Sequence, residues 1–439
     1  MDAAAYFKGK KITLMGLGLL GRGVGDAKYL AECGADLIVT DLKTEELLAP
    51  SLQKLKEYNI TYTLGEHTLE DFTDRDLVLK APKTPLDSPY IQEAKQHGIP
   101  VTMSTALAAS LAKKEGATVI GVTGTRGKTT TTMLIAHLLK EAGKHVVLGG
   151  NIRDVSTLAR LPEITKDTYL VLELDSWQLQ GFREEGLSPD VAVFTTFYRD
   201  HMDYYEGDED AYLKDKAEIF VHQDKDDVLV LGSQIAPRVL EAYPNLKNTP
   251  IVATAQSIES WEMQLLGAHN RDNAACAVAA VEALGVERNV IQEGLRSFKG
   301  VEGRLELIAE KRGVKFYNDT TSTTPEAAYA ALTALNDKEH VILICGGYDK
   351  GLDMSLLLNA IPLYTKKVVL LDGSGTKRIQ EELKEASVHS SLAAAVSEAI
   401  EGASQGDVVL FSPAFASFGM FKNEYDRGDQ FVALINNLP

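Results

Sequence analysis

The sequence predicts an α/β fold in three domains, each built around a largely parallel sheet. Short apolar runs rich in Val and Ile, such as KITLM at 11–15 and HVILIC at 340–345, alternate with stretches of helix length. This alternation is typical of parallel α/β layers. The alternation restarts along the chain, and 439 residues exceed what one hydrophobic core usually supports. We expect domains over residues 1–106, 107–303 and 304–439.

Composition excludes several classes of function. The net charge of −17 argues against a nucleic-acid-binding surface, which needs basic patches to displace counterions. No apolar run approaches the roughly 20 residues of a membrane helix, and the start, MDAAAYFKGKKITLM, lacks the apolar core of a signal peptide. The three cysteines lie far apart in apolar settings, which suits reduced thiols. We therefore expect a cytoplasmic protein without membrane insertion.

The first domain carries a glycine motif. GLGLLG at 16–21 fits G-x-G-x-x-G after the strand KITLM, and Asp41 ends the next apolar run where a ribose-binding carboxylate would stand. The pattern indicates a Rossmann-like domain with a diphosphate near a helix N-terminus. It does not say which nucleotide, and taken alone it would indicate NAD and an oxidoreductase.

The central domain carries a candidate phosphate loop. GVTGTRGKTTTTM at 121–133 follows the apolar run ATVI and opens a helix-length stretch. Its glycines let backbone amides converge on phosphate oxygens, Lys128 supplies a cation, and Thr129 places a hydroxyl for Mg²⁺. Val122 occupies the place of the first glycine in the strict G-x-x-x-x-G-K-[ST] pattern. We still predict a P-loop ATPase domain that binds ATP and Mg²⁺.

Acidic and histidine candidates follow two later strands of this domain. Glu173 and Asp175 come at the end of the apolar run TYLVLEL, where a carboxylate suits a Mg²⁺ ion on nucleotide phosphates. His201, within DHMD at 200–203, fits a neutral metal ligand, a hydrogen-bond donor to substrate, or an ordinary loop histidine. The residues alone leave these three readings open.

Other polar residues have two interpretations each. Lys214 and Lys216 lie on an amphipathic segment and by default form a solvated helix face. Asn270 and Asn273 begin a helical stretch, so they are either helix caps or contacts to an adenine ring.

The last domain, also expected to be Rossmann-like, contains two loops of interest. ICGGYDKG at 344–351 ends an apolar run in glycines, and its Lys350 is placed to reach an anion. In NDTTSTTPEA at 318–327, residues 320–324 are all Thr or Ser. This run is either a solvated loop or a hydroxyl-lined nest for a ligand.

Taken together, the motifs resemble the Mur ligase family. TGTRGKTTT, ELDSWQL, DHMD, GAHN-x-x-N, ND-x(4)-TPEA and SPAFASFGMFKNEYDRG occur in this order and cover essentially the whole chain. The resemblance is strongest to the branch that adds glutamate to UDP-N-acetylmuramoyl-L-alanine. It implies an ATP- and Mg²⁺-dependent ligase of peptidoglycan precursor synthesis, acting through an acyl phosphate. It also implies a monomer with small-molecule substrates and a last domain that closes on the central one.

The resemblance also assigns roles to residues. For ATP it implies Gly124, Thr125, Arg126, Gly127, Lys128, Thr129, Thr130, Asn270, Asn273, Arg304 and Asp319. For the UDP substrate it implies Gly18, Leu19, Leu20, Asp41 and Asn151. For the incoming glutamate it implies Thr323, Lys350, Ser417 and Phe418. Catalysis is assigned to Lys128, Glu173, His201 and Lys216, and metal binding to Thr129, Glu173, His201 and a carbamylated Lys216.

The chain departs from the family pattern in the C-terminal loops and after one early strand. Thr321 stands where the family commonly has a lysine, and Glu424 where an aromatic residue often borders the glutamate. LKAPKTPLD at 79–87 replaces a common S-P-G-I turn. These departures leave L-glutamate as an alternative to the favoured D-glutamate. An NAD-dependent oxidoreductase and a non-catalytic nucleotide-binding regulator are more distant alternatives.

Overall fold

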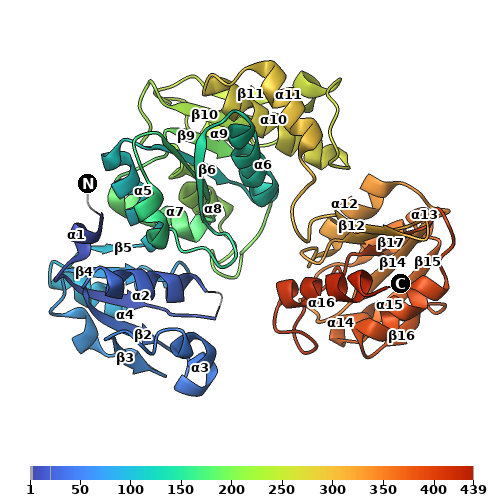
Figure 1. Cartoon of the computed structure of the whole chain (residues 1–439), viewed down its shortest axis with the longest axis horizontal. Coiled ribbons are helices and arrows are strands. Elements are labelled where there is room, and N and C mark those ends of the chain that lie inside the picture. Colours follow the sequence, from blue (N-terminus) through green and yellow to red (C-terminus); the bar gives the residue numbers. More distant parts are fainter. Residues whose placement is uncertain (1–2, 20, 439) are drawn as a thin grey trace. The chain divides into compact units, whose positions relative to one another are not determined.

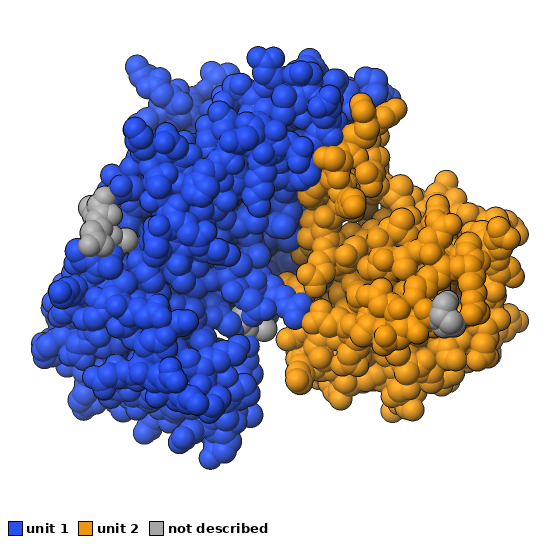
Figure 2. All heavy atoms as spheres, in the orientation of Figure 1, with its two compact units in different colours: residues 1–261, 272–295 blue, residues 262–271, 296–439 orange. Residues whose placement is uncertain are grey.

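The computed structural model describes residues 3–19 and 21–438, which form three sheets in two compact units (Figure 1). Unit 1 comprises Met1–Trp261 and Asp272–Leu295, and unit 2 comprises Glu262–Arg271 and Arg296–Pro439 (Figure 2). The first two sheets belong to unit 1 and the third to unit 2. The predicted α/β class is confirmed.

The first sheet is parallel, with strand order β3-β2-β1-β4-β5. Its strands are β1 (Lys11–Met15), β2 (Asp36–Asp41), β3 (Thr61–Leu64), β4 (Leu77–Lys80) and β5 (Val101–Thr102). The helices around it are α1 (Ala3–Phe7), α2 (Arg22–Glu32), α3 (Glu45–Gln53) and α4 (Pro89–Gln96). Because the strands are parallel, the glycine turn after β1 and the segment after β4 emerge at the same edge.

The second sheet is also parallel, with order β11-β10-β9-β6-β8-β7. Its strands are β6 (Thr118–Thr123), β7 (His145–Gly150), β8 (Thr168–Glu173), β9 (Val191–Phe194), β10 (Val228–Gly232) and β11 (Ile251–Ala253). Its helices are α5 (Ser104–Glu115), α6 (Lys128–Glu141), α7 (Ser176–Glu185), α8 (Glu209–Ala217), α9 (Ala236–Ala242), α10 (Ala268–Ala283) and α11 (Arg288–Ser297). β6 pairs with both β8 and β9, so the loops that follow these three strands meet at one edge.

Helix α5 joins the two cores of unit 1. Its residues Ala106, Ala109 and Ala112 belong to the core of the second sheet. Leu107 and Leu111 belong to the core of the first sheet. Because helical spacing puts these two sets on different faces, one short helix is buried from both sides. The first two sheets belong to one compact unit, and α5 is one of the elements that join them.

The third sheet has order β12-β13-β17-β14-β15-β16 and is mixed. Its strands are β12 (Glu306–Lys311), β13 (Val314–Asn318), β14 (Val341–Gly346), β15 (Lys367–Leu371), β16 (Ser387–His389) and β17 (Val408–Phe411). Its helices are α12 (Pro325–Leu335), α13 (Ser355–Tyr364), α14 (Ser374–Ile379), α15 (Leu392–Glu401) and α16 (Glu424–Asn436).

The antiparallel strand of this sheet comes from a tight hairpin. β12 and β13 are joined by Arg312 and Gly313, whose φ angles are 54° and 75°. Two successive residues with positive φ give a turn whose twist matches that of paired antiparallel strands. The remaining neighbours are parallel, so the C-terminal domain is a parallel α/β sheet with one added antiparallel edge strand.

Across residues 3–19 and 21–438, the structure contains no helix with both the length and the apolar character needed to cross a bilayer.

Candidate active site

The phosphate-loop candidate lies at the centre of the second sheet, between β6 and α6. Gly127 caps α6 with a φ of 85°, and a Cβ on it would lie 2.1 Å from Asn273 Oδ1. A Cβ on Gly124 would lie 2.0 Å from Thr195 Oγ1. Both positions therefore exclude a side chain, and Gly127 leads directly into α6. A glycine turn at a helix N-terminus is typical of sites that bind phosphate oxygens.

Two lysines converge on one carbonyl of this loop. Lys128 Nζ and Lys216 Nζ each donate to Gly124 O at 3.0 Å. Lys216, on α8, is 1% exposed, whereas Lys214 on the same helix is exposed. The default expectation of a solvated face is therefore wrong for Lys216. Side chains that are two residues apart on a helix point in nearly opposite directions, so only one of this pair faces water.

Burial changes the chemistry of Lys216. Its pKa is held well below the ordinary value, first by desolvation and then by the charge of Lys128. The Tyr212 ring lies 4.7 Å from Lys216 Nζ and contributes to this enclosure. Lowering the pKa of a lysine increases the share of its neutral amine, which is the nucleophilic form.

The two acids at the end of β8 have different surroundings. Asp175 is the N-cap of α7, where its side chain accepts from Gln178 N in a reciprocal capping box. Glu173 is 4% exposed, and its Oε2 is buried with no hydrogen-bond partner among the described residues. Its Oε1 lies 3.5 Å from Asn151 Nδ2. Burying a carboxylate oxygen without a hydrogen-bond partner costs free energy unless a ligand or an ion binds to it.

His201 lies in the loop after β9 with a φ of 56°. Its ring packs against Trp177 with centroids 4.5 Å apart, and its Nδ1 is 3.8 Å from Asp200 Oδ1. Burial and the charges of Lys216, Lys128 and Lys83 hold the pKa of His201 below its ordinary value, against the opposing effect of Asp200. The imidazole is therefore neutral at pH 7, which suits a hydrogen bond to substrate or a metal ligand.

Arg126 is tied to the same loop. Its guanidinium forms an ion pair with Asp200 at 3.0 Å, and its backbone N–H donates to Thr196 Oγ1. Thr125 Oγ1 donates to Tyr198 O at 3.1 Å. Together these contacts fix the phosphate loop to the segment that carries His201. Thr129 and Thr130 follow in the first turn of α6.

The described residues hold no group of three or more His, Cys, Asp or Glu side chains arranged to bind a metal ion. Mg²⁺ rarely needs such a group, because it is usually bound through one or two carboxylates together with substrate phosphates and water. Thr129 and Glu173 fit that requirement in their residue types, and the unpartnered Oε2 of Glu173 is the observation that favours an ion at this place.

The glycine turn after β1 is closed by its own carboxylate. Asp41 Oδ2 accepts from Leu17 N and Gly18 N, both at 2.9 Å, and Oδ1 accepts from Lys43 N at 2.9 Å. Asp41 is 4% exposed. Its carboxylate and these two amides are therefore satisfied internally, which disfavours a dinucleotide held as in NAD enzymes.

The other residues expected at the UDP substrate are dispersed around this turn. The Leu19 side chain is 53% exposed, and Leu20 lies outside the described residues. Asn151 Oδ1 accepts from Arg22 Nη1 at 2.9 Å, which joins the start of α2 to the loop after β7.

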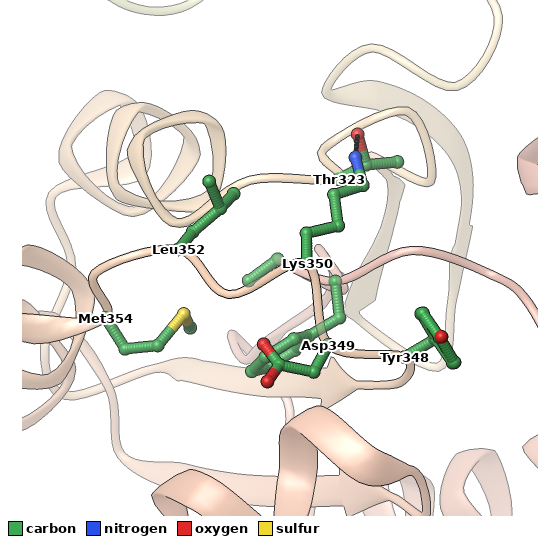
Figure 3. A pocket seen from close by; sticks show the side chains of 8 residues that line it. Thr323, Tyr348, Asp349, Lys350, Leu352 and Met354 are labelled. Atoms are coloured by element: carbon green, nitrogen blue, oxygen red, sulfur yellow. Dashed lines mark hydrogen bonds between the residues drawn. The ribbon is translucent and has the colours of Figure 1, made fainter. Parts of the chain in front are cut away.

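Unit 2 contains a pocket at the carboxyl ends of its central strands (Figure 3). Lys350 Nζ donates to Thr323 Oγ1 at 3.0 Å, so two residues expected at the glutamate come together. Asp349 is engaged by Arg378 Nη1 at 2.6 Å. The residues that line the pocket are Thr323, Tyr348, Asp349, Lys350, Leu352, Met354, Ala414 and Phe415.

The two other residues expected at the glutamate differ in exposure. Phe418 is 61% exposed, and its ring lies 5.6 Å from that of Tyr348, which lines the pocket. Ser417 is buried, and its carbonyl accepts from Phe421 N. The pocket therefore has an aromatic pair at its edge and a lysine inside it.

The hydroxyl run at 320–324 is mainly structural. Thr320 Oγ1 donates to Glu424 O and Thr321 Oγ1 to Gly303 O, both at 2.8 Å. Ser322 Oγ donates to Asp319. Of the run, Thr323 is the residue that lines the pocket. The loop is thus not solvated filler, and Thr324 Oγ1 is buried without a hydrogen-bond partner among the described residues.

Asp319 is enclosed by this run. Its Oδ2 also accepts from Ser412 Oγ at 2.7 Å, and its Oδ1 accepts from Leu305 N at 2.9 Å. Burial raises the pKa of Asp319 to about 6. Arg304 is exposed and its charge acts on Asp319. Asn270, at the start of α10, donates from Nδ2 to Leu266 O at 2.9 Å.

Two lysines near the site were not selected from the sequence. Lys80 is 3% exposed at the end of β4, and Lys83 Nζ lies 4.9 Å from the Trp177 ring. A charged residue that ends the apolar run LVLK was an available signal for Lys80, because buried lysines need a specific environment. Lys83 had no local signal, since its neighbour Trp177 is distant in sequence.

The chain matches three family profiles in order. Residues 10–103 match the Mur ligase MurD-like N-terminal domain, residues 122–257 the Mur ligase middle domain, and residues 303–415 the Mur ligase glutamate ligase domain. Two full-length relatives are named UDP-N-acetylmuramoylalanine--D-glutamate ligase. The protein of Roseiflexus sp. (strain RS-1) is 38% identical, with 98% of this chain and 99% of the relative covered. That of Acetivibrio thermocellus is 35% identical, with 100% and 98% covered.

Solved structures share the fold at lower identity. UDP-N-acetylmuramate-alanine ligase MurC from Thermotoga maritima superposes with a TM-score of 0.62 at 20% identity, covering 97% of this chain and 99% of that one. MurF ligase from Thermotoga maritima in complex with ADP gives a TM-score of 0.56 at 16% identity, covering 91% and 94%.

A substitution at the helix cap tests the phosphate loop. We predict that Gly127→Ala weakens binding of a fluorescent ATP analogue with Mg²⁺ by about tenfold or more, because the new methyl group meets Asn273 at a positive φ. Gly143→Ala is the matched control at the other end of α6, with a φ of 70° and nothing within 4 Å of the added Cβ. Equal affinities for the two variants would contradict this account of the loop.

Proposed function

Because this chain belongs to the Mur ligase family, as its three matching domains and full-length relatives show, we propose that it is an ATP-dependent ligase. In this proposal it joins D-glutamate to UDP-N-acetylmuramoyl-L-alanine in the cytoplasm, as a step of peptidoglycan precursor synthesis. The names of its relatives support the acceptor and the D form. An oxidoreductase would leave the phosphate loop and Lys216 without a function.

The observation that carries the proposal is the convergence of Lys128 and Lys216 on Gly124 O, beside the neutral His201. Lys128 and the loop amides would hold the phosphates of ATP. Thr129 and Glu173 would hold Mg²⁺, which when bound supplies charge neutralisation on the phosphate oxygens. His201 would donate a hydrogen bond to the reacting groups. Asn273, against Gly127, would border the nucleotide.

The reaction has two steps. An oxygen of the acceptor's alanyl carboxylate attacks the γ-phosphorus of ATP, the bond to the β-phosphate oxygen breaks, and ADP leaves. The glutamate amine then attacks the carbonyl carbon of the acyl phosphate. The carbon–oxygen bond to phosphate breaks, the amine loses a proton, and an amide and inorganic phosphate remain. Negative charge develops on the phosphoryl oxygens in the first step, and Lys128 is placed to stabilise it.

The pocket of unit 2 would receive the amino acid. Lys350 is the cation among its lining residues, so it would pair with a glutamate carboxylate. Thr321 does not replace the lysine common in the family, because its hydroxyl already donates to Gly303 O. Phe418 and Tyr348 would cover the bound side chain. Ser417, buried close by, would orient this loop.

Lys216 is suited to carbamylation. A neutral lysine amine adds to CO₂, forming a nitrogen–carbon bond and releasing a proton, and the product is an anionic carbamate. Burial lowers the pKa of Lys216, which increases the share of the neutral amine that reacts with CO₂. The carbamate would replace a buried amine by an oxygen ligand beside Lys128 and Gly124. The carbamate would therefore provide a carboxylate-like group for a divalent cation at a position where the sequence has a lysine.

The function is tested by phosphate release from the purified chain with ATP, Mg²⁺ and UDP-N-acetylmuramoyl-L-alanine. We expect release that depends on glutamate, with the D form at least about tenfold faster than the L form, a difference of about 1.4 kcal/mol in transition-state free energy. A reaction without the acceptor gives the background. Release that is equally fast without any amino acid would remove the ligase proposal.

The carbamate is tested by comparing two lysines of α8. Lys216→Ala should lose nearly all ligase activity, and formate or acetate should restore part of it by supplying a carboxylate in the vacated space. Lys214→Ala is the matched control, because Lys214 is exposed on the same helix and should keep full activity. Retained binding of the ATP analogue would show that the variant is folded. Rescue by methylamine in place of formate would contradict the carbamate.

A further inference from the structure

The segment that follows β4 places a lysine against the candidate active site. It runs from Ala81 to Thr84, directly after Lys80 at the end of β4, and packs against the glycine turn, since a Cβ on Gly16 would lie 2.8 Å from Ala81 Cβ. Lys83 is exposed, and its Nζ lies 4.9 Å from the centroid of the Trp177 ring.

Lys80 fixes the backbone on both sides of Lys83. Its buried ammonium donates to Thr84 O at 3.0 Å and to Pro82 O at 3.4 Å. These two carbonyls belong to the residues that flank Lys83 in sequence. A buried lysine that donates to two carbonyls constrains the backbone strongly. Removing its side chain would leave both carbonyl oxygens without this donor and would leave a cavity. The segment is therefore held in one conformation, and the position of Lys83 is set by it.

Trp177 connects Lys83 to the reacting groups. The Trp177 side chain is buried, and its ring packs against His201 at 4.5 Å and against Tyr204 at 5.5 Å. Its Nε1 is buried without a hydrogen-bond partner among the described residues. Lys83 and His201 thus both contact one indole ring. An indole N–H that has no protein partner is available to a ligand group at the same place.

The local charges leave Lys83 without a counterion. No carboxylate of the described residues lies within 4.0 Å of Lys83 Nζ. Three acids near the site are engaged elsewhere: Asp200 pairs with Arg126, Asp215 pairs with Arg183, and Asp175 caps α7. The charge of Lys83 adds to those of Lys128 and Lys216 at His201. In a protein of net charge −17, such a local excess of cations fits an anionic substrate group.

We propose that Lys83 binds the reacting carboxylate of the acceptor, with Lys80 as a positioning residue that holds the segment. The proposal rests on the proposed function, which requires a carboxylate beside His201. Lys128 and the loop amides serve the ATP phosphates, whereas Lys83 comes from the first domain and contacts the indole that packs on His201. The diphosphate of the acceptor is the other anion with the same chemistry, and the experiment separates the two.

The first measurement is steady-state kinetics of Lys83→Gln and Lys83→Arg. Lys83→Gln should raise KM for the acceptor about tenfold or more and leave KM for ATP within about twofold. Lys83→Arg should keep most of the acceptor affinity, because it keeps the charge. Lys56→Gln, which removes an exposed lysine of the same domain, is the matched control and should behave as the native protein. An unchanged acceptor KM in an active Lys83→Gln enzyme would overturn the proposal.

The second measurement identifies the anion. An acceptor analogue with a carboxamide in place of the alanyl carboxylate should inhibit native protein and Lys83→Gln equally, because the charge partner is absent. If Lys83→Gln weakens the carboxamide analogue as much as the acid, Lys83 serves the diphosphate and the carboxylate assignment is wrong. If native protein and Lys56→Gln both fail to turn over, the proposed function fails, which is a different outcome from failure of Lys83→Gln alone.

Discussion

The burial of Lys216 against Gly124 O is the constraint on which the central site depends. A lysine amine removed from water on α8 is tolerated because one loop carbonyl accepts from it and the Tyr212 ring encloses it. The same carbonyl binds Lys128, so two amines meet at the point where the phosphate loop turns. Burial, together with the two lysines, lowers the pKa of His201, and Arg126 ties the loop to Asp200. The result is a site with excess positive charge beside a carboxylate, Glu173, that lacks a partner.

Unit 2 depends on a comparable buried cation. Arg427 on α16 is fully buried and donates to Thr320 O, Thr320 Oγ1 and Phe415 O at 2.7, 3.2 and 3.0 Å. Burial lowers the pKa of Arg427 to about 10. It joins the hydroxyl run after β13 to the loop after β17, and both loops contribute to the pocket that contains Lys350. The hydroxyls that look like ligand contacts in sequence therefore mostly support the pocket wall.

The features that could be predicted from the sequence are those that depend on residues close together in the chain. A strand, a glycine turn, Lys128 and a helix are local in the chain, and the structure has β6, Gly124–Gly127 and α6 in these places. Lys216 was ambiguous, because its burial depends on a carbonyl 92 residues away. For the same reason the closure of the glycine turn by Asp41 and the position of Lys83 on Trp177 could not be read from local patterns. The antiparallel pairing of β12 with β13 was not predicted from the sequence.

The most direct test of the account follows oxygen atoms. The central claim is that ATP activates the acceptor's carboxylate as an acyl phosphate before the amine attacks. An acceptor labelled with ¹⁸O in its alanyl carboxylate should pass one labelled oxygen to the inorganic phosphate in each turnover, measured by mass spectrometry. Phosphate that carries no label while the amide product forms would contradict the account, because the carboxylate oxygen would then never have been bonded to phosphorus.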